Sequence, residues 1–317
     1  MKRIAVLTRD CAGVNAALRS LVRSAAAKNV EVIGVMRGYE GLIEGDIKLL
    51  DRRSVSGIIN RGGTILKTAR SKRFKTISGQ RQAARTLKDH DIEGLIVIGG
   101  NGSLTGAHIL ASRHSIPVIG IPATIDNDVN GVTMTIGSDT ATNVALEALD
   151  KVRDTATSLE RIFVVEVMGR DCGYIALRVA LAAGCEEAIL PELKFNIKNI
   201  CENIVEGNIR GKRSWIIIVA EGKAKASKIA SEITKITSLE TREVVLGHVQ
   251  RGGSPTAFDR MLAARYGHYA VEVLLKGKTD RCVALKDEQL ITIPLAKAIK
   301  KKDIEVEKYY KLIKILT

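Results

Sequence analysis

Residues 94–128, GLIVIGGNGSLTGAHILASRHSIPVIGIPATIDND, contain two short apolar runs separated by a helical segment. The runs Gly94–Ile98 and Val118–Pro122 are strand-sized and rich in Ile and Val, so they predict buried strands, and Ser103–Arg113 predicts the helix between them. This is the pattern of a βαβ unit, whose two strands lie parallel. We therefore predict an α/β fold with helices on both faces of a parallel sheet.

The same alternation extends through most of the chain. The further predicted strands are Ile4–Thr8, Val30–Met36, Ile162–Val167, Trp215–Ala220 and Glu243–Gly247, and the further predicted helices are Ala16–Lys28, Ser78–His90, Thr140–Thr155, Tyr174–Ala183 and Pro255–Leu275. A chain of 317 residues is long enough for about two domains. No low-complexity linker marks a boundary between them, so ordered chain must cross it.

Composition excludes several classes of protein. Apolar residues make up 45% of the chain and charged residues 26%, which is typical of globular proteins. The N-terminal apolar run ends at Thr8, too early for a signal peptide, and no apolar stretch is long enough to span a membrane. The five cysteines include no CxxC pair, and Cys11 has no base beside it in the sequence, so we expect reduced, non-catalytic thiols. These features predict a cytoplasmic protein.

The formal net charge of +14 raises the alternative of nucleic-acid binding. The Lys and Arg residues are dispersed, however, and the densest run, Lys297–Lys302, has only Tyr309 and Tyr310 near it as stacking residues. We therefore expect a solvated, lysine-rich face there, with no nucleic-acid partner. Other arginines are better placed to bind small anionic molecules.

Polar or glycine-rich loops directly follow four of the predicted strands. They are Arg9–Asn15, Gly99–Ser103, Ala123–Asp128 and Met168–Gly173. Ligands of α/β proteins bind at the carboxyl ends of the strands. Gly99–Ser103 opens a helix, so its N–H groups can hold phosphate oxygens, although its spacing is not the dinucleotide fingerprint and a tight glycine turn is the alternative. Asp126 and Asp128 can act on a phosphoryl acceptor or a metal, or can simply cap a turn.

Several further motifs accompany these loops: Gly62-Gly63-Thr64 with Arg70, Met168-Gly169-Arg170, Ala220-Glu221-Gly222, Arg242, and Gly247-His248-Val249-Gln250-Arg251-Gly252-Gly253-Ser254-Pro255. With them, the chain resembles the bacterial ATP-dependent 6-phosphofructokinase family along nearly its whole length. NAD kinases and diacylglycerol kinases resemble it only at the glycine loop. The resemblance implies a homotetramer whose active sites borrow residues from a neighbouring subunit.

The resemblance also implies the architecture of the phosphofructokinase fold. Two similar three-layer α/β/α domains with mainly parallel sheets are expected. The larger, nucleotide-binding domain would comprise residues 1–138 plus 251–305, and the smaller, sugar-phosphate-binding domain residues 139–250 plus 306–317.

The implied reaction is the transfer of a phosphoryl group from ATP, with Mg²⁺, to fructose 6-phosphate, giving fructose 1,6-bisphosphate in glycolysis. Asp126 would take the proton of the sugar 1-hydroxyl, Thr124 and Asp128 would flank it, Arg170 would orient the site and Arg70 would bridge the transferred phosphoryl group. The nucleotide would contact Arg70, Ser71, Gly100, Asn101, Gly102 and Ser103. The sugar phosphate would contact Arg161, Met168, Gly169, Glu221, Arg242, His248 and Arg251.

Two finer properties follow from the same resemblance. Gly102 and Ala123 stand where pyrophosphate-using relatives carry Asp and Lys, so ATP is the expected donor. A nucleoside diphosphate or phosphoenolpyruvate would act as allosteric effector at Arg19, Arg23, Arg52, Arg53, Arg153, Glu186, Arg210 and Lys212. The alternative for the pair Arg19 and Arg23 is a basic helix face in solvent.

Two places depart from the family pattern. The first loop of the family usually reads LTSGGDAPGMNAA, whereas residues 7–17 read LTRDCAGVNAA, two residues shorter and without the glycine pair. Arg9 in this loop either holds phosphate by its charge or obstructs the site. Asn101 replaces the family's magnesium-binding Asp, so magnesium affinity is expected to fall. The alternative function is therefore a catalytically impaired paralogue that binds sugar phosphate or an effector as a regulatory or partner subunit.

Overall fold

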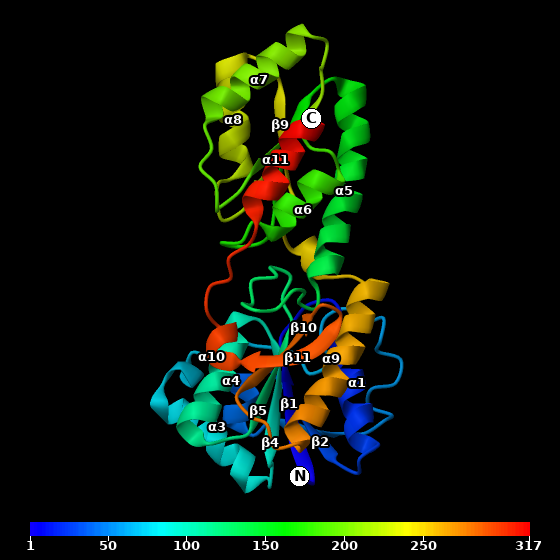
Figure 1. Cartoon of the computed structure of the whole chain (residues 1–317), viewed down its shortest axis with the longest axis vertical. Helices are drawn as coiled ribbons and strands as arrows, with labels where there is room; N and C mark the ends of the chain where they lie inside the picture. The colour runs from blue at the N-terminus through cyan, green and yellow to red at the C-terminus, as the bar shows by residue number, and fades with distance from the viewer. The chain divides into compact units, whose positions relative to one another are not determined.

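A seven-stranded sheet and a four-stranded sheet organise the chain, each with its own helices (Figure 1). In this computed structural model, which describes residues 1–317, the two sheets belong to separate units. Unit 1 consists of Met1–Thr140 and Arg251–Lys302, and unit 2 consists of Ala141–Gln250 and Asp303–Thr317. The predicted α/β fold class is confirmed, because both sheets are mainly parallel and carry packed helices.

The sheet of unit 1 has the strand order β11-β10-β5-β4-β1-β2-β3. Its strands are β1 (Arg3–Thr8), β2 (Glu31–Val35), β3 (Ile47–Leu50), β4 (Gly94–Gly99), β5 (Val118–Pro122), β10 (Arg281–Lys286) and β11 (Gln289–Pro294). The central strands run parallel, and only the edge strands β3 and β11 pair antiparallel with their neighbours. The carboxyl ends of β1, β4 and β5 therefore lie side by side.

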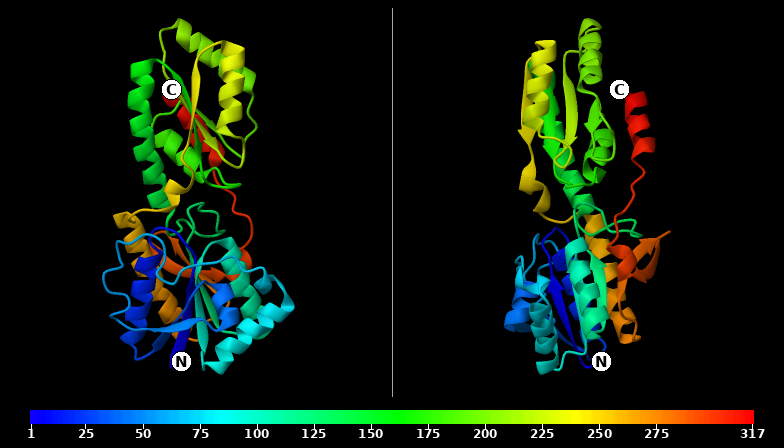
Figure 2. Two further views of the ribbon diagram at one scale, coloured as in Figure 1. Left: turned by 180° about the vertical axis from the view of Figure 1, so that it is seen from behind. Right: turned by 90° about the vertical axis from the view of Figure 1, so that its left-hand side faces the viewer.

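Helices cover both faces of this sheet (Figures 1 and 2). On one face, α1 (Val14–Ala26) packs against α9 (Ala257–Leu275). On the other lie α2 (Tyr39–Glu44), α3 (Ile77–Asp89), α4 (Asn101–His114) and α10 (Leu295–Ala298), with the short 3-10 helix η1 (Arg73–Lys75) beside α2 and α3. Leu7, Leu95 and Val97 of the sheet are fully buried in the core beneath these helices.

The sheet of unit 2 is entirely parallel, with the order β7-β8-β6-β9. Its strands are β6 (Ile162–Val167), β7 (Glu187–Ile189), β8 (Trp215–Ala220) and β9 (Thr241–Val245). α7 (Ile197–Ile209) and α8 (Ala226–Thr237) pack on one face, whereas α6 (Tyr174–Ala182) and the C-terminal α11 (Val306–Leu316) contact β7. The long α5 (Ser138–Leu159) precedes β6, and the 3-10 helix η2 (Gly247–Arg251) follows β9.

The predicted strand Glu243–Gly247 is wrong by two residues. β9 begins at Thr241 and ends at Val245, and Gly247, with φ +54°, starts η2. β9 is an edge strand whose residues are all exposed or only partly buried, so the apolar pattern that marks buried strands is weak there.

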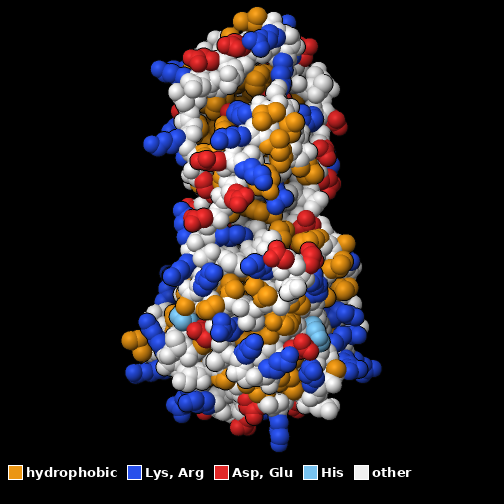
Figure 3. Space-filling view, in the orientation of Figure 1, with side chains coloured by type: hydrophobic (Ala, Val, Ile, Leu, Met, Phe, Trp, Pro, Cys, Tyr) orange, Lys and Arg blue, Asp and Glu red, His pale blue; other side chains and the backbone are white.

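On the face shown in Figure 3, charged side chains are spread out rather than gathered into one basic region. Lys and Arg side chains on the face shown are interspersed with Asp and Glu. None of the helices combines the length and the apolar character needed to cross a membrane.

Candidate active site

Three loops meet at the carboxyl edge of the unit 1 sheet, because they follow the adjacent strands β1, β4 and β5. Asn101, at the start of α4, donates from Nδ2 to Asp128 Oδ2 at 2.8 Å and to the Asp128 carbonyl at 3.3 Å. Gly100 lies against Thr124, since a Cβ at position 100 would approach the Thr124 Cβ to 3.1 Å. The structure therefore brings together the glycine loop and the carboxylate loop, as the sequence predicts.

Asp126 occupies a buried and braced position in this edge, with 2% of its surface exposed. The Thr124 hydroxyl lies 3.3 Å from Asp126 Oδ2 and 3.3 Å from the Asp126 backbone N, which donates to it. Asn127, with φ +50°, donates to the Thr133 carbonyl and accepts from the Thr135 N–H. These contacts fix the loop that carries the predicted base.

Lys302 adds a brace to this loop that the sequence did not reveal. Its Nζ donates to the carbonyls of Asn127 at 2.9 Å and Val132 at 2.7 Å. The expectation of a purely solvated lysine face is therefore wrong at this residue, although Lys297, Lys300 and Lys301 are exposed. No motif marks Lys302, because its acceptors are backbone carbonyls.

The predicted nucleotide-contacting residues Arg70 and Ser71 differ in their surroundings. Arg70 is exposed, and its guanidinium makes no ion pair or hydrogen bond within the chain. The Ser71 hydroxyl instead accepts from the N–H of Phe74, a residue of η1, at 3.0 Å. The hydrogen bond from the Ser71 hydroxyl lowers the pKa of Glu40, with a smaller contribution from Arg73.

The residues near Asn101 do not form a site for a resident magnesium ion. One carboxylate oxygen of Asp128 already accepts the Asn101 amide N–H, while Asn101 Oδ1 is buried without a partner. No group of three His, Cys, Asp or Glu side chains is arranged to hold a metal. A single carboxylate and an amide carbonyl are a poor donor set for Mg²⁺.

The carboxyl edge of the unit 2 sheet carries a loop held by two acceptor side chains. Glu221 Oε1 accepts from the N–H groups of Gly169 at 3.2 Å and Arg170 at 3.1 Å. Gln250, which is 1% exposed, accepts from the Met168 N–H at 2.8 Å. The predicted residues Met168, Gly169, Arg170 and Glu221 thus come together. Gln250 belongs to the Gly247–Pro255 motif but was not predicted to hold this loop.

Gly222 is required for this arrangement. A Cβ at that position would lie 1.8 Å from the Arg170 carbonyl oxygen, far inside any allowed contact. The glycine of Ala220-Glu221-Gly222 therefore permits the Met168–Gly173 loop to pass directly over the end of β8.

Arg161 and Arg242 lie at the opposite edge of the same sheet, where the strands begin. Both guanidinium groups bind the Glu240 carboxylate, Arg161 Nε at 2.8 Å. Opposite ends of β6 are about 20 Å apart at about 3.3 Å per residue. Within unit 2, these two arginines are therefore well separated from Glu221 and Met168.

The other two predicted sugar-phosphate residues are open to a ligand. His248 in η2 is exposed and makes no hydrogen bond in the chain. Arg251, which belongs to unit 1, makes no hydrogen bond or ion pair, and its Nε is buried without a partner. A buried guanidinium nitrogen normally has an acceptor, so its orphan state points to an anionic ligand.

The Phosphofructokinase family matches residues 3–274, most of the chain. This chain belongs to the phosphofructokinase family. It is 50% identical over 319 residues to the ATP-dependent 6-phosphofructokinase of Thermotoga neapolitana, with all of both chains covered, and 52% identical over 304 residues to that of Brevibacillus brevis, with 95% of each covered. The resemblance found in the sequence is confirmed.

A solved structure supports the same relationship. Phosphofructokinase from Saccharomyces cerevisiae superposes with a TM-score of 0.87 at 34% identity, over 94% of this chain. This chain spans only 45% of that yeast chain. The predicted phosphofructokinase fold is confirmed.

The residues that family resemblance assigns to an effector are divided between the units. In unit 2, Lys212 Nζ pairs with Glu186 at 3.0 Å, and Arg153 donates to the carbonyls of Ala183 and Gly184. Arg210 pairs only with Glu206, one turn earlier in α7. In unit 1, the side chains of Arg19, Arg23, Arg52 and Arg53 make no ion pair.

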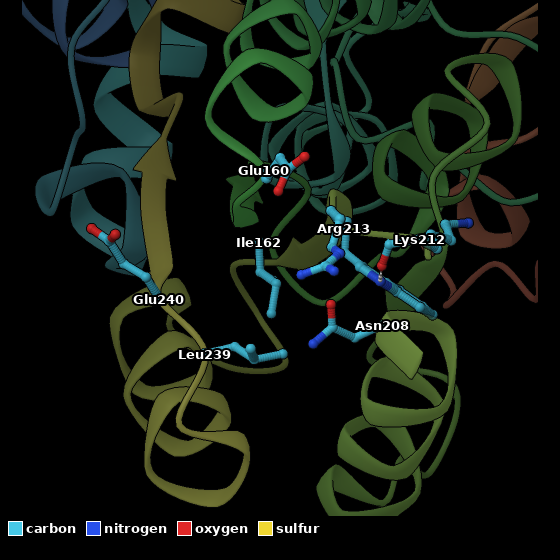
Figure 4. Close-up of a pocket in the computed structure, with 8 residues that line it drawn as sticks. Glu160, Ile162, Asn208, Lys212, Arg213, Leu239 and Glu240 are labelled. Carbon is cyan, nitrogen blue, oxygen red and sulfur yellow. Dashed lines mark hydrogen bonds between the residues drawn. The ribbon is translucent and has the colours of Figure 1, made fainter. Parts of the chain in front are cut away.

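A hollow lies beside Lys212 at the amino edge of the unit 2 sheet (Figure 4). It is lined mostly by polar and charged side chains, those of Glu160, Asn208, Lys212, Arg213 and Glu240, together with Ile162, Trp215 and Leu239. Lys212 also lies over the Trp215 ring, 4.8 Å from its centre.

Cys11, the cysteine of the first loop, is not placed as a nucleophile. It is 2% exposed, and burial, reinforced by the Asp259 carboxylate, raises the pKa of its thiol far above the ordinary value. The thiolate, which is the reactive form, is therefore disfavoured at neutral pH.

Proposed function

We propose that this chain phosphorylates fructose 6-phosphate to fructose 1,6-bisphosphate with ATP, a step of glycolysis. Relatives at about half identity over the full length carry the name ATP-dependent 6-phosphofructokinase. The structural observation that carries the proposal is Asp126, a buried carboxylate on a braced loop beside the glycine loop of α4.

In this mechanism, Asp126 removes the proton of the sugar 1-hydroxyl as that oxygen attacks the terminal phosphorus of ATP. Thr124 orients the carboxylate through the 3.3 Å contact. The exposed Arg70 neutralises charge on the transferred phosphoryl group, and Arg170 orients the acceptor side. Asp128 has a supporting role and is held by Asn101.

ATP and its magnesium ion enter together. The phosphates lie at the start of α4, where the N–H groups of Asn101 and Gly102 donate to no carbonyl of the chain and the first turn contains no acidic residue. Gly100, Asn101, Gly102 and Ser103 form that turn, and Gly102 has open space around its Cα. Mg²⁺ would be held mainly by the phosphate oxygens of the nucleotide and would neutralise their charge. Unit 1 is the nucleotide-binding part in this scheme.

The sugar phosphate binds to His248 and Arg251, with Glu221, Met168 and Gly169 shaping the pocket for the sugar. Arg161 and Arg242 cannot join Glu221 within one copy of unit 2, because the length of the sheet separates them. They therefore serve the active site of a neighbouring subunit, so the working form is a homo-oligomer, and we propose a tetramer.

Regulation and location complete the proposal. A nucleoside diphosphate or phosphoenolpyruvate binds the basic set that includes Arg19, Arg23, Arg153 and Lys212, with Glu186 as its carboxylate, and changes the affinity for fructose 6-phosphate. The enzyme acts in the cytoplasm, where both substrates are found.

The test is coupled production of fructose 1,6-bisphosphate by the full chain, with ATP or pyrophosphate supplied separately and Mg²⁺ varied. Turnover with ATP and little with pyrophosphate is the expected result. Calorimetric binding of fructose 6-phosphate without turnover with either donor would replace the proposal with the impaired-paralogue alternative. Turnover with pyrophosphate alone would overturn the donor assignment.

A further inference from the structure

Arg9 lies where the shortened first loop meets the glycine loop. It follows β1 directly, and its backbone N–H donates to the Ile98 carbonyl at the end of β4. The stem of its side chain crosses Gly99, because a Cβ at position 99 would lie 2.9 Å from Arg9 Cγ. Gly99 therefore leaves the space that the Arg9 stem and the Ser103 side chain occupy.

The guanidinium of Arg9 hydrogen-bonds to the segment that leads to Arg70. Its NH1 donates to the Thr68 hydroxyl and to the Ala69 carbonyl, both at 3.0 Å. These acceptors are the two residues directly before Arg70. The contact is part-buried, where a charge-assisted hydrogen bond is stronger than at an open surface.

Arg70 needs such a brace, because residues 51–72 lie outside helices and strands. The early part of this segment is held by Asn15, which donates to the carbonyls of Arg61 and Gly62 and accepts from the Ile65 N–H. Thr8 adds a contact to Thr64 at 2.6 Å. Neither side chain reaches beyond residue 65, so Arg9 is the contact nearest to Arg70 from the first loop.

We propose that Arg9 is a positioning residue that acts through Arg70. In place of the missing glycine pair, it fixes the backbone at Thr68 and Ala69 so that the Arg70 guanidinium points at the transferred phosphoryl group. This inference rests on the proposed function, which places Arg70 at the phosphoryl group. It replaces both earlier expectations for Arg9, direct phosphate binding and obstruction of the site.

The test is a double-mutant cycle on the full-length protein, with kcat and the affinity for a non-hydrolysable ATP analogue as readouts. Arg70→Ala is expected to lower kcat by about 10²- to 10³-fold, as for loss of one preorganised charge-stabilising group. Arg9→Ser is expected to lower kcat by about tenfold, since misplacement of a catalytic group by about 1 Å has effects up to a hundredfold. If Arg9 acts through Arg70, adding Arg9→Ser to Arg70→Ala changes kcat by less than about twofold.

Two companion variants sharpen the cycle. Thr68→Val removes one of the two acceptors and should give a smaller loss in the same direction, which Arg9→Ser does not increase further. Arg3→Ser is the matched control, because Arg3 also bonds a backbone carbonyl, that of His90, but at the opposite end of β1. It should leave kcat unchanged.

The outcomes separate the hypotheses. Losses that multiply in the double variant would show that Arg9 contacts the donor itself, and an unchanged or faster Arg9→Ser enzyme would show that it positions nothing; either overturns the proposal. If the parent protein has neither turnover nor affinity for the ATP analogue, the proposed function fails and this inference fails with it. If it binds the analogue without turnover, the cycle is read from the affinity for the analogue.

Discussion

The loops at the carboxyl edge of the unit 2 sheet are held by acceptor side chains, whereas two cationic donors brace the loops at the carboxyl edge of the unit 1 sheet. In unit 2, the acceptors Glu221 and Gln250 hold backbone N–H groups of the Met168–Gly173 loop. In unit 1, the donors Arg9 and Lys302 hold backbone carbonyls, and Asn101 holds a carboxylate.

The difference between the two sheet edges coincides with the positions at which the sequence departs from the family pattern. The unit 2 loops keep the family motifs, and their contacts need no new residue. In unit 1, where the glycine pair and the acidic residue are missing, Arg9 and Asn101 are tied to neighbouring groups rather than left unengaged. Altered phosphate-binding residues can therefore be structural replacements, which is compatible with retained activity.

Removing the Asp126 carboxylate at the carboxyl edge of the unit 1 sheet should have the largest effect on turnover. Asp126→Asn keeps the shape of the side chain but removes the base, so kcat should fall by about 10²- to 10⁴-fold. Fructose 6-phosphate affinity should stay within a few-fold, because the 6-phosphate is bound elsewhere. Steady-state rates and calorimetry on the same preparations measure both. A kcat within a few-fold of the parent would remove Asp126 from the mechanism.

Replacing an arginine that is proposed to bind the sugar phosphate should have the next largest effect. The size of the effect should depend on whether that arginine already has a partner within the chain. Arg251 has no partner in the chain, so Arg251→Ala should raise the KM for fructose 6-phosphate by about 10- to 100-fold, the equivalent of one or two charge-assisted hydrogen bonds. Arg242 must leave Glu240 to bind phosphate, so Arg242→Ala should raise it less. The KM for ATP is the internal control, and unchanged sugar affinity in both variants would refute the clamp.

The sequence predicted the parts of the site that consist of glycine turns and of strand ends. Gly100 and Asp126 follow hydrophobic strands, so their meeting at one sheet edge follows from parallel pairing alone. Gln250 and Lys302 were missed because they bind backbone atoms of loops distant in sequence, a relation that no local pattern encodes. Strand β9 was misplaced because edge strands lack the continuous apolar pattern of buried ones.

A smaller effect should come from freeing the arginines at the other edge of unit 2. Glu240→Gln removes the carboxylate that holds Arg161 and Arg242, so the KM for fructose 6-phosphate should fall by about two- to fivefold, the range of a partly exposed ion pair. Glu147→Gln, which opens the exposed pair with Lys151, is the control. A higher KM would mean that Glu240 orients the arginines for the ligand instead of competing with it.

The smallest expected effect concerns Asn101, where the departure of unit 1 from the family can be reversed by a single substitution. Asn101→Asp replaces the amide that donates to Asp128 at 2.8 Å by a second carboxylate. Two carboxylates in contact repel each other, which raises the pKa of the pair and weakens binding of metal-free nucleotide. A magnesium ion carried by the nucleotide relieves that repulsion, because carboxylate oxygens are its preferred ligands.

The Mg²⁺ concentration for half-maximal rate should therefore fall by no more than about twofold in Asn101→Asp, while ADP affinity in the presence of a chelator decreases. Thr105→Asp, one turn further along α4 and exposed, adds the same charge without facing Asp128, so it should change neither quantity. A lower magnesium requirement in both variants would reveal a general charge effect. If neither quantity moves in Asn101→Asp, residue 101 does not face the metal, and the contact with Asp128 serves only to hold the loop.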